Sequence, residues 1–210
     1  MRNLPPSAKD PGRSVRHAAA ALLALLPLAA CSGAGANYPD RPDVAQAQEG
    51  WCLALAKSEG SGPAWEHTNT CRTADTAASP AYLRGMTKCF FERVSAAQEG
   101  GDTAAVDRSQ MLGECNDKVL IDLPEGGPGV EEVLDARCQR AERCEKTAYA
   151  ECKAAVKRLE PAQQALFTSM YNATALHDIA GCLSSGCSDN EEEARDACYK
   201  KFADKLLWFP

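Results

Sequence analysis

The stretch SPAYLRGMTKCFFERVSAAQEGG, residues 79–101, decides the fold class of this 210-residue chain. Ser79 can cap a helix by accepting a hydrogen bond from its first turn, and proline is favoured at the first helical position, here Pro80. Glycine commonly follows the last turn of a helix, as residues 100–101 do. Between these ends, apolar residues recur every three or four positions: Leu83, Met86, Phe90, Val94 and Ala97. This spacing predicts an α-helix that buries one face in a core.

Helical spacing continues on both sides of this segment. Before it, we expect an irregular polar stretch over residues 64–78, preceded by a helix with one apolar face: Val44, Ala47, Trp51 and Leu55. After it, Asp102 or Thr103 is expected to open another helix, with these residues facing inward: Val106, Leu112, Cys115 and Val119. The pattern stops at Pro124-Glu-Gly-Gly-Pro-Gly129, which we interpret as a linker over residues 124–129.

Beyond the linker, helices are expected over residues 130–144 and 147–159, and from Pro161 onward with a break near Asn172. Asp189 is expected to cap the last helix, whose apolar residues recur every four positions: Ala194, Cys198, Phe202 and Leu206. Its three initial glutamates are explained by the positive end of a helix, since no EF-hand spacing for calcium is present. The sequence predicts an all-α helical bundle, with a first helical unit over 43–123 and a second over 130–210.

The two predicted units resemble each other. Residues 79–90 align with residues 172–183, and four apolar or cysteine positions match: Leu83 with Leu176, Met86 with Ile179, Cys89 with Cys182, and Phe90 with Leu183. Farther out, Cys52 aligns with Cys144 and Cys115 with Cys198. Two interpretations stay open, an internal duplication and a chance match between helical sequences. A duplication predicts two helical units with similar cross-links.

The chain contains 11 cysteines, and ten of them lie beyond residue 31: Cys52, Cys71, Cys89, Cys115, Cys138, Cys144, Cys152, Cys182, Cys187 and Cys198. An even number in an exported chain predicts a disulfide framework, here with five bridges that staple the bundle. No C-x-x-C spacing occurs, so zinc sites, redox pairs and haem attachment are not expected. Ten cysteines allow about 900 pairings, by the counting that gives 105 for eight. The pairing therefore stays open.

The first 31 residues fit an export signal. Four basic residues precede an apolar run over residues 18–30, which is too short to cross about 30 Å of hydrocarbon. Leu28-Ala29-Ala30-Cys31 resembles the lipobox of bacterial lipoproteins at each position. This resemblance, which covers the signal only, implies cleavage between Ala30 and Cys31 and attachment of a diacylglycerol to the Cys31 thiol.

Residues 31–42 would then form a flexible tether between the lipid and the domain. Ser32 stands in place of the Asp that retains many lipoproteins at the inner membrane, so we expect the outer membrane. The alternative is an ordinary signal peptide cut after Ala36, in the A-x-A sequence of residues 34–36, which would release a soluble secreted protein.

Charge and motifs exclude several function classes. Beyond residue 30, the chain carries 19 Lys and Arg against 28 Asp and Glu, a net charge of −9, with no basic cluster, so nucleic acid is not an expected partner. His67 and His177 are the two histidines of that part, and neither a G-x-S-x-G nor an H-E-x-x-H motif occurs. We therefore expect no catalytic residues, no metal and no cofactor. The C-terminal Trp208 and Phe209 either contact a partner or fold over one end of the bundle.

These observations lead to the hypothesis of a lipoprotein held at the membrane through Cys31, with a structural or binding role in the cell envelope and no enzymatic activity. Composition and lipobox resemble those of Cys-rich helical lipoproteins of bacteria, a likeness that implies no activity. An envelope protein is the expected partner. Two alternatives stay open: a carrier of a small hydrophobic ligand, and an inhibitor or immunity-type partner of an enzyme.

Overall fold

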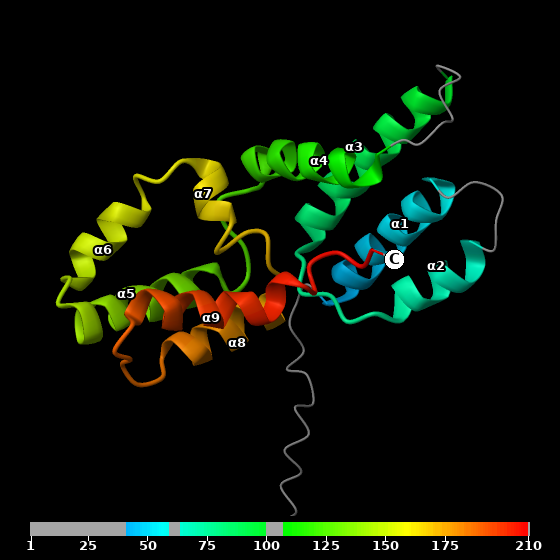
Figure 1. Cartoon of the computed structure of the whole chain (residues 1–210). Helices are drawn as coiled ribbons and strands as arrows, with labels where there is room; N and C mark the ends of the chain where they lie inside the picture. The colour runs from blue at the N-terminus through cyan, green and yellow to red at the C-terminus, as the bar shows by residue number, and fades with distance from the viewer. Residues whose placement is uncertain (1–40, 59–63, 100–106, 210) are drawn as a thin grey trace, which may run out of the picture. The chain divides into compact units, whose positions relative to one another are not determined.

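The computed structural model describes residues 41–58, 64–99 and 107–209 (Figure 1). The predicted signal over residues 1–30, Cys31 and the predicted tether as far as residue 40 lie outside the described residues. The described residues belong to one compact unit, and all their regular elements are α-helices. The predicted all-α fold class is therefore confirmed.

Four helices precede the linker, and we call them the N-terminal helices: α1 (Arg41–Ser58), α2 (Ala64–Thr73), α3 (Pro80–Glu99) and α4 (Arg108–Asp122). Residues 124–129 contain no helix. The C-terminal helices follow: α5 (Val130–Glu145), α6 (Tyr149–Val156), α7 (Pro161–Ala165), α8 (Ala173–Leu183) and α9 (Glu191–Ala203). Among the described residues, no helix has the length and apolar character needed to cross a membrane.

The segment that decided the fold class forms α3 as predicted. The Ser79 hydroxyl accepts a hydrogen bond from the Tyr82 amide at 3.1 Å, which caps the helix. Four residues of the predicted face are buried: Leu83, Met86, Phe90 and Val94. On α1, which packs on α3, Trp51 is 1% exposed and its ring lies 5.4 Å from that of Phe90.

Two sequence expectations about helix positions are wrong. Residues 64–73 form α2 rather than an irregular stretch, because packing against α1 and the disulfide between Cys52 and Cys71 stabilise a helix that lacks an apolar repeat of its own. The cap of α9 is Asn190 rather than Asp189, since the Asn190 side chain accepts the hydrogen bond from the Glu193 amide at 3.3 Å.

The start predicted for the helix after residue 101 lies outside the described residues. The described helix, α4, begins at Arg108 and is capped by Asp107, which accepts from the Gln110 amide at 3.1 Å. Its predicted inward residues Cys115 and Val119 are buried. The segment from Pro161 forms the short helix α7, and the predicted break lies at Asn172, which caps α8.

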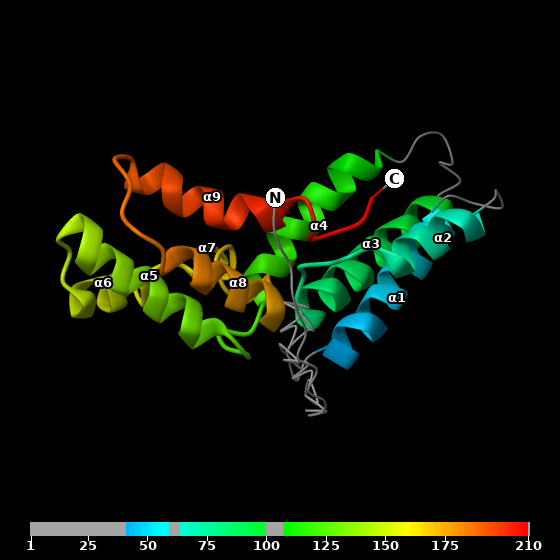
Figure 2. The same cartoon turned by 90° about the horizontal axis from the view of Figure 1, so that it is seen from below.

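The helices pack in two similar sets. Among the N-terminal helices, α1 packs on α2 and α3, and α3 packs on α4. Among the C-terminal helices, α5 packs on α6 and α8, and α8 packs on α9 (Figures 1 and 2). One hydrophobic core cluster includes residues from both sets, and α4 packs on α7. The two predicted units therefore share a continuous core.

Candidate functional site

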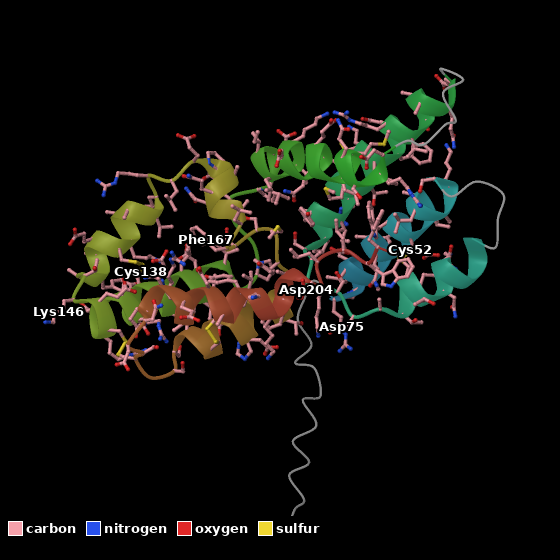
Figure 3. All side chains as sticks on the ribbon, viewed as in Figure 1. Cys52, Asp75, Cys138, Lys146, Phe167 and Asp204 are labelled. Carbon is pink, nitrogen blue, oxygen red and sulfur yellow. A yellow bond between two sulfur atoms is a disulfide. The ribbon has the colours of Figure 1, made fainter. Side chains whose placement is uncertain are left out.

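All ten cysteines of the described residues form disulfides, as predicted. Four bridges join consecutive helices of one set: Cys52–Cys71 between α1 and α2, Cys89–Cys115 between α3 and α4, Cys138–Cys152 between α5 and α6, and Cys182–Cys198 between α8 and α9. The fifth, Cys144–Cys187, joins α5 to the segment between α8 and α9. Figure 3 shows the bridges in yellow and labels Cys52 and Cys138.

The cross-links follow the same order in both sets of helices. The first helix of each set is bridged to the second, and the last two helices are bridged to each other. The bridge between the last two helices joins aligned cysteines in both sets, Cys89–Cys115 and Cys182–Cys198. The earlier bridges differ, because Cys144, which aligns with Cys52, bonds Cys187 instead of a cysteine of α6. The similarity holds at the level of helices, and it favours the duplication over a chance match.

The two sets meet at a seam, which we define as residues 76–79 and 169–172. Ala78 and Tyr171 form an isolated antiparallel β-bridge there. Two backbone hydrogen bonds of 2.8 Å flank it: from the Ser79 amide to the Met170 carbonyl, and from the Asn172 amide to the Ala77 carbonyl. The segments thus contribute equivalent groups to each other.

The capping side chains also cross the seam. The Ser79 hydroxyl donates to the Ser169 carbonyl at 2.6 Å, and the Asn172 amide group donates to the Thr76 carbonyl at 2.7 Å. In each case, the acceptor lies three residues before the cap of the other set. Each cap also accepts a hydrogen bond from the backbone amide three residues later, in α3 or α8.

A further pair of bonds holds the segments that follow the last helix of each set. The Thr76 hydroxyl donates to the Leu206 carbonyl at 3.1 Å, and the Ser169 hydroxyl donates to the Pro124 carbonyl. Each of these hydrogen bonds of the seam thus has a counterpart when the two seam segments are exchanged, which is the pattern of a local twofold relation. The seam is the structural feature expected of a duplicated unit whose copies pack on each other.

The C-terminal tail packs on the N-terminal helices. The Lys205 carbonyl accepts from the Ala77 amide at 2.8 Å, and the Trp208 carbonyl accepts from the Trp51 indole N–H at 2.9 Å. Lys205 also pairs with Asp75, which Figure 3 labels, at 2.9 Å. Trp208 is half-buried and Phe209 is 36% exposed. This placement favours folding over the bundle as the interpretation of the tail.

A buried charge joins α5 to the turn between α8 and α9. Arg140 is 2% exposed and donates to the Leu183 carbonyl at 3.3 Å and to the Glu191 carboxylate at 2.7 Å. The Ser188 amide also donates to Glu191, and these two contacts lower the pKa of that carboxyl, the amide being the larger cause. The guanidinium therefore neutralises the C-terminal end of α8 and the first turn of α9 together.

The same region places a carboxylate near two sulfur atoms. Cys144 Sγ, Cys187 Sγ and a Glu191 oxygen lie within 4.8 Å of one another. The sulfurs are bonded to each other, however, and a metal ion binds thiolates rather than a disulfide. This cluster is therefore part of the disulfide framework.

One of the two histidines beyond residue 30, His177, lies next to a carboxylate. His177 Nδ1 lies 2.8 Å from the Glu132 carboxylate on α5, and both side chains are exposed. His67 lies on α2. Sequence reasoning did not detect the contact between His177 and Glu132, since 45 residues separate them.

Three of the hollows in the described part of the chain lie along α3, and each has charged side chains in its lining. The first holds about 270 Å³, and we call it the seam hollow; its lining includes Asp43, Ser79, Arg84, Pro124, Val130 and Tyr171. The second holds about 250 Å³ beside Lys88 and Asp122, and the third about 330 Å³ beside Arg84 and Lys88. No local motif in the sequence marks the seam hollow, because its lining comes from α1, α3, the linker, α5 and the seam.

Tyr171 is the most buried titratable group of the seam hollow. It is 5% exposed, and burial, together with the neighbouring Tyr199, raises its pKa to about 12. Arg84 and Asp43 are exposed. No family model matches the chain, and neither the comparison with curated proteins nor that with solved structures finds a match.

Proposed function

We propose that this chain is a lipoprotein of the bacterial cell envelope, anchored in the membrane through lipid on Cys31, whose disulfide-stapled helical domain has a structural or binding role. The pairing of the cysteines carries the proposal. Ten of the 11 cysteines are used by the five bridges, and the eleventh is the last residue of the lipobox. Disulfides persist in exported proteins, which agrees with an export signal.

The arrangement of the chain is suited to such an anchor. Nine residues separate Cys31 from the start of α1 at Arg41, and an extended chain of that length reaches at most about 30 Å. The net charge of −9 beyond residue 30 disfavours contact with anionic headgroups. We therefore infer that the helical domain lies outside the bilayer, at the end of the tether. Because Ser32 replaces the Asp that retains lipoproteins at the inner membrane, we infer that the lipid is inserted in the outer membrane.

The lipid decides between this proposal and a soluble secreted protein. Cells of a Gram-negative host that express the full chain are labelled with an alkyne analogue of palmitate, beside the variant Cys31→Ser. We expect the wild-type protein to carry the label, to fractionate with membranes, and to yield an N-terminal peptide that begins with acylated Cys31. The variant should carry no label. An unmodified wild-type chain that begins at Asn37 contradicts the proposal.

The carrier and inhibitor alternatives find less support. A carrier of hydrophobic ligands needs an apolar cavity, and each of the hollows described along α3 has charged side chains in its lining. An inhibitor that docks through the tail needs Trp208 free for its target, and this residue packs against the core. Neither is proposed.

A further inference from the structure

The seam hollow contains two opposite charges that do not pair with each other. Asp43 lies in the first turn of α1, and Arg84 lies in the second turn of α3. Both line the hollow, and neither makes an ion pair with any residue in the described part of the chain. A ligand that carries both a positive and a negative charge can pair with the guanidinium and the carboxylate at once.

The C-terminal helices contain a comparable pair of ionisable side chains that are in contact. Glu132 lies in the first turn of α5, as Asp43 lies in the first turn of α1, although the alignment of Cys52 with Cys144 places Asp135 at the position of Asp43. His177 follows the cap of α8 by five residues, as Arg84 follows the cap of α3. His177 and Glu132 are in direct contact at 2.8 Å. Asp43 and Arg84 instead make no ion pair with each other, and both line a hollow of about 270 Å³.

Tyr171 adds a hydroxyl group to the residues that line the hollow. Tyr171 lines the hollow with only 5% of its surface exposed, and its hydroxyl makes no hydrogen bond within the described residues. The Tyr171 hydroxyl oxygen is not among the buried atoms without a partner in the described residues, so it is accessible to solvent and can form a hydrogen bond with a ligand. Because burial raises its pKa to about 12, the hydroxyl keeps its proton at neutral pH and can donate it in a hydrogen bond.

The first residues of two helices, whose N-terminal ends are positive, also line the hollow. Pro80 begins α3 and Val130 begins α5, and both line the hollow. No side chain caps α5. The positive ends of helices favour a carboxylate, which reinforces the charge of Arg84 and opposes that of Asp43. The lining of the hollow therefore combines positive groups with one negative side chain.

We propose that the seam hollow binds a small zwitterion that carries one carboxylate and one ammonium group, such as a free α-amino acid. Arg84 and the Tyr171 hydroxyl donate hydrogen bonds to the carboxylate, and Asp43 accepts from the ammonium. The volume of about 270 Å³ lies just below the range of pockets for drug-sized ligands, which fits a smaller molecule. This proposal rests on the binding role proposed above and does not depend on lipidation of Cys31.

Isothermal titration of the purified full-length chain in detergent tests the proposal. The probes are glycine and L-alanine, with acetate and methylammonium as the two half-ligands at matched ionic strength. We expect both amino acids to bind and both half-ligands to bind at least about tenfold more weakly. Asp43→Asn and Arg84→Gln should each weaken amino-acid binding by about tenfold or more, and Tyr171→Phe by less.

Lys88→Gln is the matched control, because Lys88 is an exposed cation one turn beyond Arg84 that does not line the seam hollow. Its affinity should equal that of the wild type, and thermal unfolding confirms that each variant is folded. The proposal is overturned if neither amino acid binds at concentrations up to about 10 mM, because the dissociation constant would then exceed the millimolar range. It is also overturned if acetate binds as tightly as glycine and Asp43→Asn has no effect, since the hollow is then an anion site. If the wild-type chain binds the amino acids but carries no lipid on Cys31, the membrane anchor is refuted and the amino-acid site is not.

Discussion

Substitution of Gly85 by alanine is expected to destabilise the protein, although alanine is the better helix former. Gly85 lies inside α3, where the helix crosses α4. A Cβ atom added there would lie 2.7 Å from Cγ1 and 3.2 Å from Cγ2 of Val119. These distances are shorter than real contacts, and the β-branched Val119 has few alternative rotamers. The two helices must therefore move apart.

The magnitude follows from two opposing terms. Alanine gains about 1 kcal/mol of helix propensity over glycine. Overpacking of a core contact costs about 1–3 kcal/mol. Gly113 supplies the control, because it lies on the exposed side of α4 with nothing within 4 Å of an added Cβ. Gly113→Ala should therefore gain up to about 1 kcal/mol, and Gly85→Ala should be about 1–3 kcal/mol less stable than Gly113→Ala.

Guanidinium denaturation under non-reducing conditions measures this difference. The disulfide between Cys89 and Cys115 lies one turn from Gly85 and Val119 along the same crossing, so it should keep the slope of the transition unchanged. In the double variant Gly85→Ala/Val119→Ala, the new methyl group finds space, and the loss should be smaller than the sum of the single losses. Equal midpoints for Gly85→Ala and Gly113→Ala would refute the packing described for α3 and α4.

Three further predictions concern the C-terminal helices. Arg140→Met should lower the free energy of unfolding by about 3–5 kcal/mol, because it leaves buried acceptors unpaired, whereas the exposed Arg143→Met should cost under about 1 kcal/mol, both by denaturant midpoint. The lowered pKa of Glu191 means that its carboxylate stabilises the fold above about pH 4.5 and loses this effect as pH falls through the folded pKa. The difference in melting temperature between Glu191→Gln and wild type should therefore decrease below about pH 4.5 and disappear below the folded pKa of Glu191. Lys146 has φ 61°, so Lys146→Gly should raise stability by about 0.5–1 kcal/mol in the same denaturation assay.

Helices with local start and stop signals could be predicted from the sequence. Ser79 with Pro80 defines the start of α3, and the spacing of its apolar residues defines its buried face. α2 could not be predicted in this way, because its stability comes from packing on α1 and from the bond between Cys52 and Cys71. At α9, Asp189 and Asn190 are both good caps, and only the position of the side chain relative to the first turn selects between them.

Contacts between distant residues were beyond the sequence. The parity of the cysteines predicted that bridges form, but the partner of Cys144 depends on where the turn after α8 comes to lie. Likewise, 41 positions separate Asp43 from Arg84, and Tyr171 reaches the same hollow only because the seam brings residues 169–172 to α3. Local patterns contain no information about such assemblies.

The seam itself provides the last prediction. Asn172→Ala removes a helix cap, worth about 1 kcal/mol, and leaves the Thr76 carbonyl without its donor, which costs about 1–3 kcal/mol. The expected loss is about 2–4 kcal/mol. Ser79→Ala should cost a similar amount, since it caps α3 and donates to Ser169 in the same way. Asn190→Ala is the control, because Asn190 caps α9 from an exposed position without crossing the seam.

Denaturant midpoints of the three variants decide whether the seam contributes as a symmetric unit. We expect Asn172→Ala and Ser79→Ala to agree within about 1 kcal/mol and both to exceed Asn190→Ala, whose loss of a cap alone is about 1 kcal/mol. If Asn172→Ala costs no more than Asn190→Ala, the bond across the seam adds nothing to stability. The equivalence of the two sets of helices would then have no energetic basis, and the comparison of Arg84 with His177 would lose its physical support.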